Sequence, residues 1–121
     1  MECERLKPVR WVGSSLKDVR SFPRAVRADI GAALFTAQKG ETDRSTKPLK
    51  GFGGRGVMEI VTSHIGDTWR TVYTARIQEA IYVLHAFQKK SKTGIATPKK
   101  EIDLVRRRLA DAEKDTRERQ N

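Results

Sequence analysis

The stretch LHAFQKKSKTGIATPKKEIDLVRRRL, residues 84–109, contains the transition that decides the fold. An almost continuous apolar segment, residues 81–87, ends in a run of lysines, which predicts a strand buried in the centre of a sheet. A glycine-containing turn follows, and Thr97 and Pro98 then predict the N-cap and the first residue of a helix. Cations gathered at the end of a central strand are costly unless they meet an anion. The pattern therefore indicates a phosphate-rich partner such as RNA.

The composition indicates a basic protein with one modest core. The chain has 121 residues, and 25 Lys and Arg against 15 Asp and Glu give a formal net charge of +10. Residues 57–88 carry two basic and three acidic side chains, whereas residues 89–97 carry three lysines and no acid. A basic rim around a nearly neutral sheet is typical of nucleic-acid-binding proteins. We do not expect the protein to bind a membrane. The lone Cys3 cannot form an internal disulfide, and no segment suits a signal peptide or a bilayer span, so we expect a cytoplasmic protein.

Periodicity and turn residues predict the remaining elements. In chain order they are a strand at residues 9–12, a helical turn at 16–20, a helix at 23–40, a loop at 40–56, and strands at 57–62, 68–75 and 81–87. The last helix has an apolar stripe that consists of Ile102, Val105, Leu109 and Ala112. Residues 113–121 have no apolar anchor and are expected to fray. All of residues 1–121 are assigned to a single domain.

Two patterns that suggest cofactors or metals do not have the context that such sites need. The segment GFGGRG, residues 51–56, matches the dinucleotide-binding G-x-G-x-x-G, but that motif follows a strand and opens a helix, whereas here a strand follows. His64 and His85 are the only histidines, and no Cys or carboxylate stands at metal-ligand spacing from them. We therefore expect no cofactor and no metal. His85 lies in the predicted central strand, where a core histidine with one hydrogen bond is the ordinary interpretation.

Glu59 and Arg70 are ionisable residues inside two predicted strands of one hairpin. Strand alternation places each on one face of its strand, and the two side chains meet if those faces are paired. One interpretation is a salt bridge on a solvated face, whose loss costs less than about 1 kcal/mol. The other is a cleft in which Arg70 contacts a phosphate while Glu59 orients it or moves a proton. On both interpretations we expect Arg70→Ala to leave the fold intact.

Cations from three separate segments converge near the same predicted sheet face. Arg70 belongs to the hairpin, and the others lie in the glycine-containing loop and after the central strand: Lys50, Arg55, Lys89, Lys90 and Lys92. Lys89 and Lys90 point to opposite faces if the strand continues, so at least one of them should reach the cleft. This convergence favours phosphate binding over a merely solvated charge run.

Three segments of the chain resemble the RelE/ParE superfamily of toxins, and most closely its HigB-like, phage-associated branch. They are KPLKGFGGRGVMEIV, DTWRTVYTARI and AIYVLHAFQKKSKTGIATPKKEIDLVRRRL, and the likeness extends from Pro8 to about Ala112. The resemblance implies a compact α/β (α+β) fold. Its N-terminal helices would pack on a twisted, largely antiparallel sheet of about four strands, followed by a C-terminal helix.

The resemblance also implies an activity, which is metal-independent cleavage of mRNA on the ribosome by attack of a ribose 2′-OH on the adjacent phosphate. By position, Arg70 matches the family's strand arginine and Lys90 its basic residue at the end of the last strand. Glu59 stands where some members carry a lysine, and the aromatic residue that several members place beyond the last strand has no counterpart. The general acid and base remain open between Glu59 and His85, because arginine and lysine stabilise charge or act as acids at neutral pH.

Three functions are compatible with these residues. The favoured one is a ribosome-dependent endoribonuclease toxin with a helix-turn-helix antitoxin as its cognate partner. The second is a ParE-like inhibitor of DNA gyrase, which keeps the fold without the nuclease residues. The third is a non-catalytic, phage-derived nucleic-acid-binding protein. Glu59, Arg70 and Lys90 favour the first function.

Overall fold

The computed structural model describes residues 6–89 and 97–120, which form five strands and three helices. Their order is β1 (Val9–Trp11), α1 (Ser15–Arg20), α2 (Arg24–Gln38), β2 (Thr46–Pro48), β3 (Val57–His64), β4 (Asp67–Thr74), β5 (Ile81–Lys89) and α3 (Lys99–Gln120). The expected α+β class, with helices before and after the main strands, is confirmed.

A single sheet joins the strands in the order β1-β5-β4-β3-β2. Three neighbouring pairs are antiparallel, and β1 alone runs parallel to its neighbour, pairing only with residues 81–83 of β5. The expectation that β5 lies inside the sheet is confirmed, and its side chains are buried from Ile81 to Ala86. Because β1 is so short, no described strand pairs with the other edge of residues 84–89.

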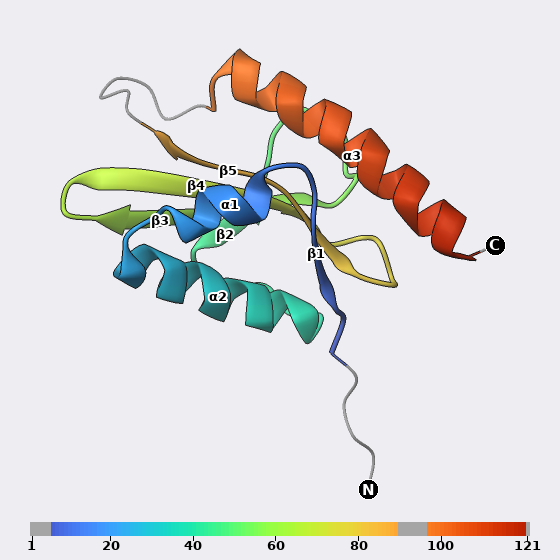
Figure 1. Ribbon diagram of the computed structural model, residues 1–121, viewed down its shortest axis with the longest axis horizontal. Coiled ribbons are helices and arrows are strands. Elements are labelled where there is room, and N and C mark those ends of the chain that lie inside the picture. Colours follow the sequence, from blue (N-terminus) through green and yellow to red (C-terminus); the bar gives the residue numbers. More distant parts are fainter. Residues whose placement is uncertain (1–5, 90–96, 121) are drawn as a thin grey trace, which may run out of the picture.

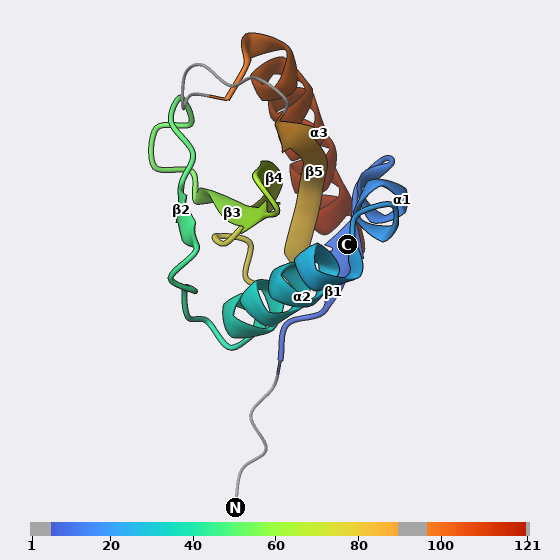
Figure 2. The ribbon, with the colours of Figure 1, turned by 90° about the vertical axis from the view of Figure 1, so that its left-hand side faces the viewer.

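The sheet is covered on both faces, with α1 and α2 on one side and α3 on the other (Figures 1 and 2). On the α2 side the core contains Val26, Ile30, Trp69, Tyr73 and Val83. On the α3 side the core contains Val72, Tyr82, Leu84, Val105 and Leu109. Successive residues of each strand point to opposite faces of the sheet. Burial of the apolar ones on both faces is the main contribution to the stability of the fold.

One irregularity in β5 decides which side chains meet α3. Val72 pairs with His85 while Tyr73 pairs with Val83, so Leu84 is the extra residue of a β-bulge. Leu84 packs in the α3-side core and His85 bonds to a residue of α3. The bulge therefore places two successive side chains on the same face of the sheet.

The loop expected at residues 40–56 is not entirely irregular. Its middle forms β2, which pairs with β3 through Thr46, Lys47 and Pro48, so the sheet has five strands where about four were expected. A strand of three residues gives no readable alternation, and proline is tolerated because β2 lies at the edge of the sheet.

Both ends of α3 differ from the expectation. Thr97 is not the N-cap, because the carbonyl of Pro98 accepts the first helical hydrogen bonds, from Glu101 and Ile102. The segment after Ala112, expected to fray, is helical as far as Gln120. Polar contacts hold it where apolar ones are lacking: Arg55 to Glu113, Tyr82 to Asp115 and Thr116 to Glu79.

Candidate functional site

A buried ion pair lies on the α3 face of the sheet. Val61 is the direct cross-strand partner of Arg70, and Glu59 that of Val72, so Glu59 and Arg70 are diagonal neighbours. Arg70 Nη1 donates to Glu59 Oε1 at 2.9 Å, and the side chains are 6% and 1% exposed. The expectation that they meet is confirmed, but the face is not solvated. Two charges shielded from water attract each other far more strongly than two charges on the surface. Removing one of them therefore costs the protein far more stability.

Thr97 covers this pair from the segment before α3. Its hydroxyl donates to Glu59 Oε2 at 2.7 Å, so both oxygens of the carboxylate accept a hydrogen bond, one from Arg70 and one from Thr97. Two hydrogen bonds and burial hold the carboxylate in one orientation. In this arrangement Glu59 orients Arg70 and, at 1% exposure, presents almost no surface to a substrate.

A cavity of about 250 Å³ lies beside the pair. Its wall contains three cations and one carboxylate, together with four uncharged residues: Lys47, Lys50, Arg70 and Glu59, then Pro48, Leu49, Thr97 and Ile102. The lining therefore carries a formal charge of +2. Lysines around a partly apolar cavity of this kind suit a phosphate group.

Lys89, at the end of β5, is the fourth cation of this region. It pairs with Thr68, two positions from Arg70 on β4, which places it on the face of the sheet that carries Glu59 and Arg70. Burial lowers the pKa of Lys89 below its ordinary value of 10.5; the charges of Arg70 and Lys47 lower it further and that of Glu59 opposes them. An ammonium group with a lowered pKa releases its proton more readily than an ordinary lysine does.

A second polar pair, His85 and Glu101, joins β5 to the first turn of α3. His85 Nε2 lies 2.8 Å from Glu101 Oε1, and the side chains are 9% and 19% exposed. The His85 ring also stacks on Phe87, with centroids 5.0 Å apart. Sequence patterns indicated a core histidine with one hydrogen bond, and the contact with Glu101 is that bond.

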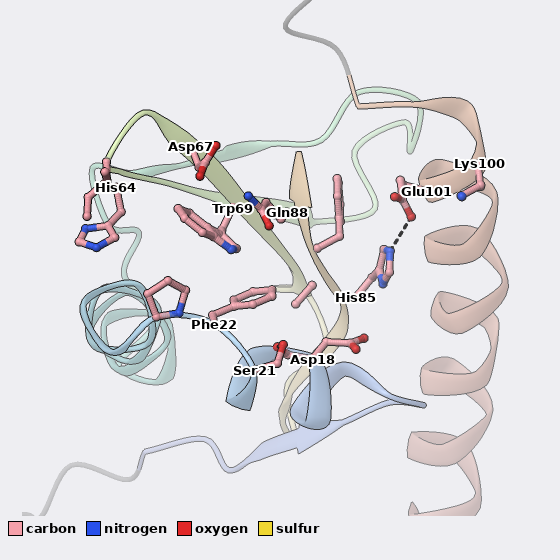
Figure 3. A pocket seen from close by; sticks show the side chains of 14 residues that line it. Asp18, Ser21, Phe22, His64, Asp67, Trp69, His85, Gln88, Lys100 and Glu101 are labelled. Carbon is pink, nitrogen blue, oxygen red and sulfur yellow. Dashed lines mark hydrogen bonds and ion pairs between the residues drawn. The ribbon is translucent and has the colours of Figure 1, made fainter. Parts of the chain in front are cut away.

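This pair lines a groove of about 890 Å³ that follows the unpaired edge of β5. Figure 3 shows His85 and Glu101 on the α3 side of the strand, with Phe22 and Trp69 on its other side. The groove also contains Asp18, Asp67 and Lys100, so its charged lining is mainly acidic, unlike that of the Lys47 cavity.

The residues expected at the site are distributed unevenly. Arg70, Glu59 and Lys50 line the cavity, and the charge of Lys89 interacts with Arg70 and Glu59, whereas His85 lines the separate groove along β5. Arg55 contacts Glu113 of α3 at 2.8 Å and does not line the cavity. Lys90 and Lys92 lie outside the described residues.

Three residues of the site were not expected: Lys47, Thr97 and Glu101. A Glu in the first turn of a helix is common, so Glu101 in the sequence TPKKE carried no signal of a site. Within residues 6–89 and 97–120 no group of three His, Cys, Asp or Glu could hold a metal ion. In the same residues, no helix has the length and apolarity needed to cross a bilayer.

Comparisons with known proteins identify the family. A chain in "The crystal structure of the toxin-antitoxin complex RelBE2" from Mycobacterium tuberculosis is similar over 75% of this chain and 100% of that one, with 17% identity and a TM-score of 0.47. None of the curated proteins matches the sequence. The family model "Phage derived protein Gp49-like (DUF891)" matches residues 17–110. Since that match covers most of the sequence, the chain belongs to the Gp49-like family of phage-derived proteins.

Proposed function

We propose that the protein is the toxin of a toxin–antitoxin system and that it cuts mRNA on the ribosome without a metal ion. The observation that carries this proposal is the cavity that Lys47 and Lys50 line together with Arg70, whose guanidinium Glu59 holds in place. Membership of the Gp49-like family supports the same function. The proposed partners are mRNA on the ribosome and a cognate helix-turn-helix antitoxin, in the cytoplasm.

In the proposed reaction the ribose 2′-oxygen attacks the adjacent phosphorus and the 5′-oxygen leaves. Negative charge develops on the phosphate oxygens, and Arg70 stabilises it, because Glu59 fixes the guanidinium before substrate arrives. Lys47 and Lys50 attract the phosphate to the cavity. Lys89, whose pKa burial lowers, donates a proton to the leaving 5′-oxygen.

Primer extension on a defined mRNA tests the proposal. The purified protein is added to a translating extract, and separately to the same mRNA without ribosomes. We expect new 3′ ends within the open reading frame only where ribosomes translate. We also expect Arg70→Lys to abolish them while Arg107→Lys, an exposed arginine of α3, leaves them unchanged.

The other two functions make different predictions in this assay. A gyrase inhibitor leaves the mRNA intact but reduces DNA supercoiling by purified gyrase. A non-catalytic binding protein leaves both the mRNA and the supercoiling reaction unchanged. Either result overturns the nuclease proposal.

A further inference from the structure

The proposed cleavage needs a group that accepts the proton of the 2′-OH, and the Glu59 side chain, 1% exposed and covered by Thr97, presents almost no surface to a ribose. Resting on the proposed function, we propose that Glu101 accepts this proton and that His85 is the positioning residue that holds the Glu101 carboxylate in place. The patterns in the sequence predicted no role for Glu101.

The contact between the two side chains supports this division of roles. His85 Nε2 lies 2.8 Å from Glu101 Oε1, whereas Glu101 Oε2 makes no hydrogen bond within the described part of the chain. The imidazole is 9% exposed and the carboxylate 19%, so Glu101 is the more accessible of the two and His85 lies behind it. Glu101 lines the groove, where a ribose hydroxyl can reach its carboxylate.

The surroundings of the imidazole indicate its tautomer. His85 Nδ1 is buried and has no hydrogen-bond partner in the described part of the chain. A proton on Nδ1 would therefore be a buried N–H without an acceptor, and the bare Nε2 would face the Glu101 oxygen. The tautomer that avoids both carries its proton on Nε2, which donates a hydrogen bond to Glu101. His85 thereby fixes the rotamer of the carboxylate, and the stacking of Phe87 fixes the ring.

The pair lies close to the proposed phosphate site. On the sheet, His85 is opposite Val72 and Phe87 is opposite Arg70, so His85 and Arg70 are diagonal neighbours on adjacent strands. Diagonal side chains of this kind are about 7–8 Å apart at their roots. Above the sheet, Thr97 contacts Glu59 and Glu101 contacts His85, so the start of α3 spans both pairs. This spacing suits a nucleotide whose phosphate meets Arg70 while its 2′-OH meets Glu101.

With this assignment the reaction balances. The O2′–H bond breaks and its proton goes to Glu101 Oε2 while the O2′–P bond forms. The P–O5′ bond breaks, and the 5′-oxygen takes a proton from the Lys89 ammonium. The products are a 2′,3′-cyclic phosphate and a 5′-hydroxyl, with one proton moved from the substrate to Glu101 and one from Lys89 to the product.

Single-turnover cleavage by the full chain on ribosomes loaded with a defined mRNA tests the role of Glu101. Glu101→Gln keeps an oxygen that accepts from His85 but cannot take a proton. We expect a fall in the cleavage rate of roughly 10²- to 10³-fold, with ribosome binding and melting temperature unchanged. Asp103→Asn is the matched control, because Asp103 is an exposed acid of the same helix that pairs with Lys99 and lines neither the cavity nor the groove. It should cleave at the wild-type rate.

Two further measurements separate a proton acceptor from a residue that only supports the fold. The wild-type rate should fall as the pH is lowered, and that acid-side fall should be absent from the residual activity of Glu101→Gln. His85→Ala should reduce the rate about 10-fold or more without changing ribosome affinity. His85→Gln, whose amide nitrogen can replace Nε2 as the donor to Glu101, should restore most of the loss.

The outcomes distinguish this inference from the function on which it rests. A wild-type protein that cuts no mRNA overturns the proposed function itself. A wild-type protein that cuts mRNA, alongside a well-folded Glu101→Gln variant that cuts at the same rate, overturns only the assignment of Glu101. If Glu101→Gln has a clearly lower melting temperature than wild type, Glu101→Asp replaces it in the test. A cleavage rate of Glu101→Asp that does not fall as the pH is lowered contradicts the assignment.

Discussion

Glu59 Oε1 and Arg70 Nη1 are 2.9 Å apart beneath Thr97, in a position that water hardly reaches. The salt-bridge interpretation of these two residues assumed a solvated face, on which Arg70→Ala costs less than about 1 kcal/mol and leaves the fold intact. Burial reverses that expectation, because removing Arg70 leaves the Glu59 carboxylate without its partner. The loss of stability should be about 3–5 kcal/mol.

Denaturant unfolding of four proteins tests this coupling: wild type, Arg70→Gln, Glu59→Gln and the double variant. Each single variant should be destabilised by several kcal/mol, whereas the double variant, which has no unpaired buried charge, should be destabilised by less than the sum. Additive effects of the two changes would contradict a coupled pair. For activity, Arg70→Lys is the better probe, because it keeps a charge beside Glu59.

The meeting of Glu59 and Arg70 could be predicted from strand alternation, but their burial could not. The alternation of side chains depends only on the residues of the two strands and on their pairing as a hairpin. The sequence indicated that hairpin correctly. The covering hydroxyl of Thr97 comes from a segment 38 residues away from Glu59. No local pattern specifies which distant segment covers a strand, so the change from a solvated to a buried pair required the tertiary structure.

The side of the sheet on which His85 lies could not be predicted from the sequence either. Period-two counting assigns Leu84 and His85 to opposite faces, but the bulge in β5 puts both toward α3. A bulge without a glycine or proline leaves no mark in the residue pattern. The contact with Glu101, and with it the candidate proton acceptor, follows from this one irregularity.

Lys89→Arg tests the role of Lys89 as a proton donor. The arginine keeps the positive charge but stays protonated, so it binds phosphate without releasing a proton. We expect the cleavage rate to fall about 100-fold while ribosome binding and its salt dependence stay the same.

The pH–rate profile provides a second check on Lys89. Because burial lowers its pKa, the basic side of the wild-type profile should begin to fall below the ordinary lysine value of 10.5. That fall should be absent in Lys89→Arg. The exposed control Lys99→Arg should match wild type in both measurements. A profile for Lys89→Arg identical to that of wild type would remove Lys89 from the reaction.

Asp115 should stabilise the far end of α3 in a pH-dependent way. Hydrogen bonds from Tyr82, at 2.5 Å, and from Arg119, at 2.7 Å, lower the pKa of Asp115 below its ordinary value of 3.8. A carboxyl with a lowered folded-state pKa stabilises the protein in full above the unfolded value, and this contribution is lost as the pH falls through the folded value.

We therefore expect Asp115→Asn to lower the melting temperature at pH 7, with a difference from wild type that shrinks as the pH falls below 3.8. Asp111 is an exposed acid one turn earlier in α3, so Asp111→Asn serves as the control. Its melting temperature should equal that of wild type at pH 7 and at pH 3. A difference between Asp115→Asn and wild type that is the same at pH 7 and pH 3 would exclude the charged state of Asp115 as its cause.

Lys50 and Arg55 looked equivalent in the sequence, as two cations in one glycine-containing loop, but the structure separates them. Lys50 lines the cavity beside Arg70, whereas Arg55 bonds to Glu113 on the outside of α3. A cation that contacts a phosphate releases a counterion when RNA binds, and one that pairs with a carboxylate of its own protein does not.

Binding of a labelled single-stranded RNA, measured against salt concentration, should therefore respond to Lys50→Ala and not to Arg55→Ala. We expect Lys50→Ala to reduce the slope of log K against log salt by about 0.7, the value for one phosphate contact on a single strand. Arg55→Ala should leave the slope unchanged and lower stability by no more than about 1 kcal/mol, because its ion pair is 46% and 37% exposed. Equal reductions of the slope would mean that Arg55 leaves Glu113 when RNA binds, and that the phosphate path extends beyond the cavity.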